Sequence, residues 1–365
     1  MNKKTFSKNQ KDFTGGGIFS LSPRRGSTGK PEFDQRIEQL VADWGGGENS
    51  ELIEELIITA LRIAEDEVGE ADLKLFNRSL KEMQATSHVF APYERERKVA
   101  VYGSARTQPG QPEYEAAKDF SDKMREHGVM TITGAGNGIM GAAQEGAGRE
   151  SSFGLNIRLP FEQSANDTII GDHKLLTFNY FFTRKLAFVK ESDAAVLFPG
   201  GFGTMDEGFE VLTLMQTGKA SVFPIVMIDA PGGSYWKTFE QFIREHLFRL
   251  GLISEDDFNL FMITDSVDEA VAELLHFYRV FHSYRYVKGK MVIRLHRNIH
   301  PEAVAQLNID FADIIVEGEI RQQSALKEER NEESIIDLPR LVFKVKRCCP
   351  GRIRVLINAI NDCDV

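Results

Sequence analysis

Short apolar segments alternate with amphipathic segments between residues 98 and 281 of this 365-residue chain. The first pair is KVAVYGSA (98–105), which is rich in β-branched residues, and PEYEAAKDFSDKMREHG (112–128), which has helical periodicity and ends at Gly128. The last amphipathic segment is SVDEAVAELLHFYRVF (266–281). Strands that alternate with helices predict an α/β fold, here a Rossmann-like doubly wound parallel sheet with helices on both faces.

Four regions are expected along the chain. Residues 97–281 hold the Rossmann-like domain, and apolar residues at three- and four-residue spacing predict an N-terminal helical extension over residues 33–96. Strand and helix signals predict a small C-terminal α+β module over residues 282–365, with a hairpin turn at Lys288-Gly289. The charged stretch from Arg321 to Ser334 is expected to be a surface loop of that module.

The fourth region, residues 1–32, differs in charge. The first 30 residues carry seven Lys or Arg against one Asp, and they are rich in Gly, Ser and Asn without periodicity. This composition predicts a disordered basic tail. A secretory signal is not expected, because no apolar segment follows the lysines.

Bulk composition limits the possible functions. The net charge of −10 argues against a general nucleic-acid-binding role, and no apolar run approaches the roughly 18 residues of a membrane helix. The three cysteines, Cys348, Cys349 and Cys363, have no metal-site spacing. We therefore expect a cytoplasmic protein without a metal, a cofactor or a membrane partner.

Glycine-rich segments follow three of the predicted strands: Gly103-Ser104-Ala105-Arg106, residues 134–141, and Pro199 to Thr204. In open parallel sheets ligands bind at the carboxyl ends of the strands, where helix N-termini point at them. Glycine lets the backbone approach a phosphate closely and leaves N–H groups free to donate. These segments therefore predict an anion site.

Two common nucleotide motifs do not fit. Gly136 to Gly141 matches G-x-G-x-x-G, but it lies in the second strand–helix unit and lacks the acid about 20 residues later that a dinucleotide site requires. A P-loop is excluded because no G-K-[ST] follows any of the glycine clusters.

The segment PGGFGTMDE (199–207) can be interpreted in two ways. Thr204 and Glu207 have the T-x-x-E spacing of a capping box, in which Glu207 only caps a helix. Alternatively, Glu207 is a catalytic acid beside a phosphate loop. Arg184 and Lys185 lie at the start of a predicted helix, where the dipole disfavours cations. A cation there needs an anion to meet, either a bound phosphate or Glu207.

Four ordered motifs together resemble the Lonely Guy (LOG) family, once labelled lysine decarboxylases. They are PGGFGTMDE (199–207), similar to the signature PGGxGTxxE, the pair Arg184-Lys185, and the loops GSA (103–105) and GAGNGIMGAA (134–143). The resemblance covers about residues 97–280. The extensions outside this range look like those of long-form bacterial members.

The resemblance implies hydrolysis of the N-glycosidic bond of nucleoside 5′-monophosphates, such as AMP or cytokinin riboside monophosphates, to free base and ribose 5-phosphate. It implies that Arg184 and Glu207 are catalytic. We expect Asp206 to be the more dispensable of the two neighbouring acids. The candidate phosphate- and nucleotide-binding residues are Gly103, Ser104, Gly136, Gly138, Lys185, Gly200, Gly201, Gly203 and Thr204. Since family members commonly complete the active site from two subunits, a homo-oligomer of at least two chains is expected.

Two other functions fit the sequence less well. A non-catalytic nucleotide carrier or sensor could use the same fold, since related Rossmann-like proteins bind molybdenum cofactor or single-stranded DNA, but such a binder has no need for both Arg184 and Glu207. Lysine decarboxylation would require a Schiff-base lysine for pyridoxal phosphate, which nothing in the sequence indicates.

Overall fold

A computed structural model of the chain describes residues 26–159, 164–329, 333–346 and 349–363. The described residues divide into two compact units, one up to Glu82 and the other from Met83 onward. The predicted basic tail lies for the most part outside the described residues. None of the described helices is both long enough and apolar enough to span a membrane.

The first unit consists of helices, as predicted. It contains α1 (Pro31–Asp43), α2 (Ser50–Glu65) and the beginning of α3 (Glu70–Phe90). Proline at the first position of α1 suits a helix start, because its missing N–H would have no partner there. The Asp34 carboxylate accepts hydrogen bonds from the Ser27 hydroxyl at 2.6 Å and from the Thr28 amide at 2.8 Å, which fixes the chain that enters α1.

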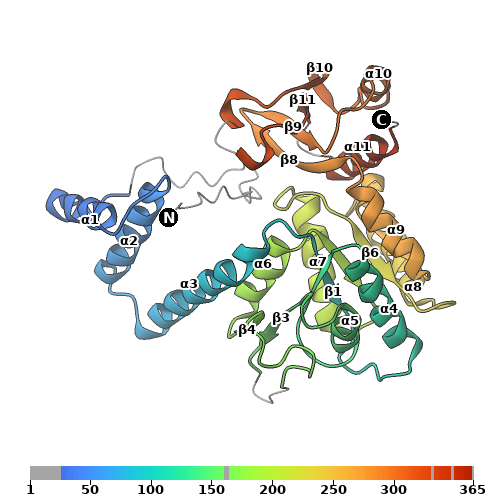
Figure 1. The fold of residues 1–365 in the computed structure, drawn as a ribbon, viewed down its shortest axis with the longest axis horizontal. Coiled ribbons are helices and arrows are strands. Elements are labelled where there is room, and N and C mark those ends of the chain that lie inside the picture. Colours follow the sequence, from blue (N-terminus) through green and yellow to red (C-terminus); the bar gives the residue numbers. More distant parts are fainter. Residues whose placement is uncertain (1–25, 160–163, 330–332, 347–348, 364–365) are drawn as a thin grey trace. The chain divides into compact units, whose positions relative to one another are not determined.

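A seven-stranded parallel sheet forms the centre of the second unit (Figure 1). Its strand order is β4-β3-β2-β1-β5-β6-β7, so the chain runs outward from β1 in one direction and then outward from β5 in the other. The predicted Rossmann-like doubly wound topology is confirmed. The strands are β1 (Lys98–Tyr102), β2 (Met130–Thr133), β3 (Ser152–Ile157), β4 (Leu175–Phe178), β5 (Ala194–Leu197), β6 (Ile225–Ile228) and β7 (Met262–Thr264).

Helices cover both faces of this sheet. Alternate strand residues point to opposite faces, so Tyr102 and Leu197 pack in one core while Val101 and Val196 pack in the other. The first core includes α6 (Phe181–Glu191), α7 (Phe202–Gln216) and α8 (Tyr235–Phe242), and the second includes α4 (Pro112–Glu126), α5 (Ile139–Ala147) and α9 (Val267–Phe277).

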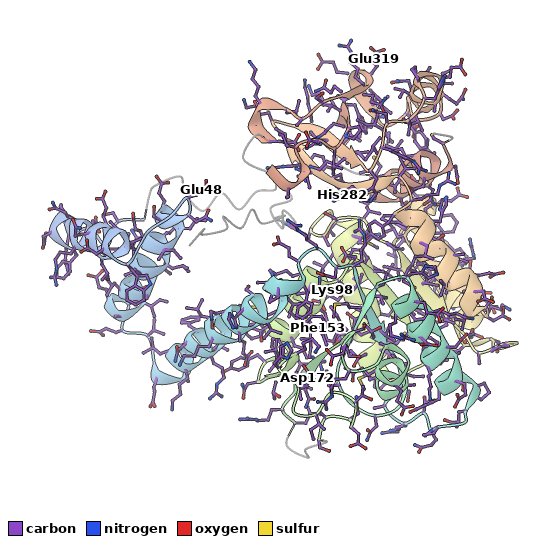
Figure 2. The ribbon with its side chains drawn as sticks, viewed as in Figure 1. Glu48, Lys98, Phe153, Asp172, His282 and Glu319 are labelled. Atoms are coloured by element: carbon purple, nitrogen blue, oxygen red, sulfur yellow. The ribbon has the colours of Figure 1, made fainter. Side chains whose placement is uncertain are left out.

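The end of α3 packs on the sheet within the second unit. Phe90 stacks on Phe153 of β3, which Figure 2 labels, with ring centroids 4.2 Å apart. Tyr93 meets the same ring edge-on at 5.1 Å. Buried aromatic pairs of this kind add to the hydrophobic stabilisation of the contact.

A four-stranded antiparallel sheet of order β10-β11-β9-β8 forms the C-terminal module. The predicted hairpin turn is present, with left-handed φ angles of 48° at Lys288 and 80° at Gly289. Apolar residues of the sheet pack against α11. The elements are β8 (Phe281–Val287), β9 (Lys290–Leu295), α10 (Pro301–Asp310), β10 (Ile315–Gln323), β11 (Arg340–Val345) and α11 (Pro350–Asp362).

The prediction of a surface loop from Arg321 to Ser334 was wrong at two places: Arg321 to Gln323 belong to β10, and the side chain of Glu329 is fully buried. Arg294 of β9 and Arg340 of β11 are direct cross-strand partners, and the Glu329 carboxylate accepts from both, at 2.7 and 3.4 Å. Like charges opposite each other in a sheet repel, so an acid between them is required. Burial opposes ionisation, but hydrogen bonds from Arg294 and the Leu326 amide hold the pKa of Glu329 below its ordinary value.

Candidate active site

Three loops meet where the strand order reverses, at the carboxyl ends of β1 and β5. The Ser104 amide, after β1, donates to the Pro199 carbonyl, after β5, at 3.1 Å. The Ile139 amide, after β2, donates to the Ser104 carbonyl at 3.0 Å. The position is the switch point at which open α/β sheets bind ligands. The predicted glycine segments are therefore brought together there.

Some of the predicted glycines are required by the loops themselves. A Cβ on Gly103 would lie 2.6 Å from Ile139, and a Cβ on Gly200 would lie 2.1 Å from the Thr204 hydroxyl oxygen. Gly138 has a φ of +67°, and a Cβ there would lie 2.3 Å from the Ser104 carbonyl oxygen. These three glycines let the loops pack closely, whatever else they contact.

Gly201 and Gly203 differ from these. A Cβ at either position would meet no atom of the described residues within 4 Å. Gly201 has a φ of −89°, and Gly203 does not have a left-handed φ, so neither backbone requires glycine. Both residues are exposed at the start of α7. The space above them is open.

The capping-box interpretation of Thr204 and Glu207 was wrong. Helix α7 begins at Phe202, with Gly201 at the N-cap position and without a side-chain capping bond. Thr204 therefore lies inside the first turn of α7, and its hydroxyl occupies the space beside Gly200. Glu207 lies further along the helix and is buried, with 6% of its surface exposed. A carboxylate at this depth must have another reason to be there.

Arg184 of α6 is the first partner of Glu207. Its Nη2 lies 3.3 Å from Oε1 of Glu207, and the two side chains are 13% and 8% exposed. The guanidinium lies near the rings of Phe181 and Phe188, 5.1 and 5.8 Å from their centroids. Its Nε is buried and has no hydrogen-bond partner among the described residues. Arg184 therefore keeps one donor for a group that the protein does not supply.

Lys185 is the second partner. Its Nζ lies 3.1 Å from Oε2 of Glu207 and 2.9 Å from both Asp206 and Glu210. Asp206 is largely exposed, whereas Lys185 is mostly buried. A single cation thus joins three carboxylates of α7, of which only Glu207 is buried. This contact explains why both basic residues are placed in the first turns of α6.

The local environment raises the pKa of Glu207. Burial is the largest cause, and it outweighs the opposing charges of Lys185 and Arg184. Tyr102, at the end of β1, is fully buried in this environment, and burial together with the charge of Glu207 raises the pKa of its phenol. A carboxyl group whose pKa is raised by desolvation in a site of this kind is suited to acid–base chemistry.

Gly136 is held by a residue that the sequence did not indicate. The Asn166 side chain donates to the Gly136 carbonyl at 2.9 Å and to the Gln144 side chain at 2.6 Å. Tyr235 was also missed: its hydroxyl donates to the Gly200 carbonyl at 2.6 Å. Tyr235 begins the helix after β6, so a search at every strand end could have found it. Neither residue belongs to a motif in the sequence.

The predicted site residues are therefore neighbours, and their chemical roles stay predictions. Gly103, Ser104 and Gly138 lie in the packed loops. Gly200 and Gly201 lead into α7, and Gly203 and Thr204 lie in its first turn. Arg184 and Lys185 contact Glu207. Over the described ranges, no group of three or more His, Cys, Asp or Glu is arranged to hold a metal ion.

The fold and this arrangement define a Rossmann-like protein with glycine loops and a buried Arg–Glu pair at the switch point. A family model described as "Possible lysine decarboxylase" matches residues 140–274. The cytokinin riboside 5′-monophosphate phosphoribohydrolase LOG of Oryza sativa subsp. japonica is 25% identical over 184 residues, which cover 49% of this chain and 73% of the rice protein. The chain is thus similar to a LOG phosphoribohydrolase over about half of its length.

Several solved structures are similar to about half of this chain. The molybdenum cofactor binding protein of Rippkaea orientalis is 18% identical with a TM-score of 0.36, covering 49% of this chain and 95% of that protein. DNA processing protein A of Helicobacter pylori is 14% identical with a TM-score of 0.32, covering 49% and 80%. Similarity at this level is no basis for assigning a ligand.

Proposed function

We propose that this protein hydrolyses the N-glycosidic bond of nucleoside 5′-monophosphates and releases free base and ribose 5-phosphate. The observation that carries the proposal is the buried pair of Arg184 and Glu207 beside three glycine loops at the switch point. The raised pKa of Glu207 and the unpartnered Nε of Arg184 are costly for stability alone. Both are useful if a substrate binds between them.

The open start of α7 supports binding of the 5′-phosphate. Gly201 and Gly203 leave free the space in front of the first amides of a 15-residue helix. Helix N-termini attract anions through these N–H groups and the helix dipole. The Thr204 hydroxyl and the Ser104 amide lie beside Gly200, which directly precedes these two open positions. The phosphate would therefore be held mainly by backbone donors.

Glu207 would act on the sugar. When the bond between C1′ and the base nitrogen breaks, positive charge develops on the ribose and the base leaves with the bonding electrons. An ionised Glu207 can stabilise this charge and take a proton from the attacking water, whose oxygen forms the new bond to C1′. Arg184 can donate to the phosphate or to the departing base, and the proposal leaves these two roles open.

The substrate class is proposed at the level of ordinary nucleoside monophosphates. The rice relative is named for cytokinin riboside 5′-monophosphates, which are modified forms of AMP. We extend the proposal to a cytoplasmic enzyme without a cofactor that works as a homo-oligomer. The four regions 1–32, 33–96, 97–281 and 282–365 are proposed as its domains, and residues 83–96 pack in one compact unit with the two regions that follow.

A nucleotide carrier or sensor on the same fold is the second candidate. Both oxygens of Glu207 are already engaged, one by Arg184 and the other by Lys185. A carboxylate that only anchors two helices would look the same. The two functions differ in whether a bound nucleotide is cleaved.

The test is incubation of the purified protein with AMP, GMP, CMP and isopentenyl-AMP, followed by chromatography for free base. Release of base from at least one of them, together with ribose 5-phosphate in equal amount, is expected. Binding of nucleotide without release of base would replace the enzyme with the carrier. Loss of both binding and release would contradict both candidates.

A further inference from the structure

Tyr235 contacts the glycine loop from outside the site. Its hydroxyl donates to the Gly200 carbonyl at 2.6 Å, which is short for an O–H···O hydrogen bond. Tyr235 is the first residue of α8, on the neighbouring strand–helix unit. The contact therefore joins α8 to the loop between β5 and α7.

The contact fixes the direction of an amide. The peptide bond between Gly200 and Gly201 is trans, because the described residues contain no cis peptide, so its C=O and N–H point in opposite directions. Holding the Gly200 carbonyl toward Tyr235 makes the Gly201 N–H point away from Tyr235. None of the described residues accepts a hydrogen bond from this N–H. Glycine on both sides of the bond would otherwise let this peptide rotate easily.

Tyr235 is itself firmly held. Asp229, at the end of β6 and 2% exposed, accepts a hydrogen bond from the Trp236 amide at 3.0 Å and so fixes the start of α8. The Trp236 side chain is fully buried, and its ring meets that of Tyr235 edge-on at 4.8 Å. The phenol therefore has a defined position before any ligand arrives.

We propose that Tyr235 is a positioning residue, which sets the Gly201 N–H as a preformed donor to the phosphate of the ligand. This inference rests on the proposed function only in that the loop binds a phosphate. It does not depend on cleavage of the glycosidic bond. Removing the hydroxyl should weaken phosphate binding by about tenfold, the effect of one well-placed hydrogen bond.

The chain offers a closely matched control. The Tyr278 hydroxyl donates to the Asp193 carbonyl, also at 2.6 Å, immediately before β5 rather than after it. Tyr278→Phe therefore deletes the same kind of bond at the opposite end of the same strand. The two variants should lose similar stability, and only Tyr235→Phe should lose affinity for phosphate.

The experiment measures calorimetric binding of ribose 5-phosphate to the full chain, to Tyr235→Phe and to Tyr278→Phe. Ribose 5-phosphate has no glycosidic bond, so its binding is independent of turnover. About tenfold weaker binding to Tyr235→Phe, with Tyr278→Phe unchanged, supports the inference. With AMP as substrate, Tyr235→Phe should raise KM about tenfold and leave kcat within about twofold.

Equal binding by Tyr235→Phe and the unaltered protein would overturn the positioning role, and so would an equal loss in both variants. If the unaltered protein binds ribose 5-phosphate but releases no base from any nucleotide, only the hydrolase proposal fails, and the comparison of variants still decides the role of Tyr235. If it binds neither ribose 5-phosphate nor nucleotide, the positioning role is overturned together with the proposed function.

Discussion

Arg184 and Glu207 lie 23 positions apart in the chain and on different helices, yet Nη2 of one is 3.3 Å from Oε1 of the other. The contact depends on α6 and α7 starting at the same edge of the parallel sheet. Each residue follows a strand, Arg184 after β4 and Glu207 after β5. Since those strands are not neighbours, the pair joins two distant parts of the sheet edge.

Glu207→Gln should lower kcat/KM for AMP by about 10²–10⁴-fold, because the amide cannot take a proton from water. The control is Asp206→Asn, which removes a neighbouring charge from the exposed side of the same helix. Asp206→Asn should change kcat/KM by less than about threefold. Circular dichroism should show both variants folded. An active Glu207→Gln enzyme would contradict the assignment of Glu207.

The acidic limb of the pH–rate profile should lie above the ordinary range of glutamate. Burial raises the pKa of Glu207, so the active carboxylate is lost by protonation at a higher pH than for an exposed Glu. The profile of kcat/KM measures this value in the free enzyme. A limb at or below the ordinary glutamate pKa would show that another group controls the activity.

Lys185→Met should move this limb further upward. The Lys185 ammonium is 3.1 Å from Glu207, and its charge favours the ionised acid, so its removal raises the pKa of Glu207 again. Lys190→Met is the matched control on α6, since Lys190 pairs with Glu191 instead. The limb should be unchanged in that variant. An unchanged limb in Lys185→Met would mean that its charge does not act on Glu207.

Gly203→Ala should separate stability from binding. A Cβ there meets nothing in the described structure, and alanine favours a helix by about 0.5–1 kcal/mol over glycine, so urea unfolding should show equal or higher stability. Ribose 5-phosphate should bind at least about tenfold more weakly, because the methyl group occupies the phosphate space. Gly200→Ala should instead destabilise the protein, since its Cβ would meet Thr204. Full binding by Gly203→Ala would place the phosphate elsewhere.

Glu329→Gln should destabilise the C-terminal module by about 3–5 kcal/mol, because Arg294 and Arg340 would remain buried and opposed without an acid. Urea denaturation measures the loss. The pKa of Glu329 is lowered in the folded protein, so its stabilising contribution is present above the unfolded pKa and disappears as the pH falls through the folded pKa. Glu328→Gln, next in the chain and paired on the surface with Lys288, should have little effect.

The sheet and the position of the site could be predicted because local patterns determine them. β-branched runs alternate with amphipathic segments, and glycine clusters at strand ends of a parallel sheet must share one edge. The pairing of Arg184 with an anion followed from its unfavourable place in the helix dipole. These inferences needed no knowledge of how distant strands are paired.

The remaining features depend on distant contacts. The T-x-x-E spacing of Thr204 and Glu207 fits a capping box, but α7 begins earlier, at Phe202. Because Gly201 and Gly203 flank Phe202 and glycine is a poor helix former, the sequence gives no local signal for this start. The burial of Glu329 follows from the register that sets Arg340 opposite Arg294, which no local pattern contains. Tyr235 contacts the loop from the next strand–helix unit, 35 positions after Gly200 in the sequence.

Gly201 is the N-cap residue of α7 and Glu207 lies within that helix, and this has a consequence for selectivity. Six residues of α-helix span about 9 Å, and a helix hardly changes its length. On the proposed function, α7 therefore fixes the distance between two parts of the substrate. The amides at its start hold the phosphate, and the Glu207 carboxylate lies at the sugar. In a nucleoside diphosphate or triphosphate bound by its terminal phosphate, C1′ would lie too far from that phosphate to be placed at Glu207. The length of this helix segment would therefore select monophosphates.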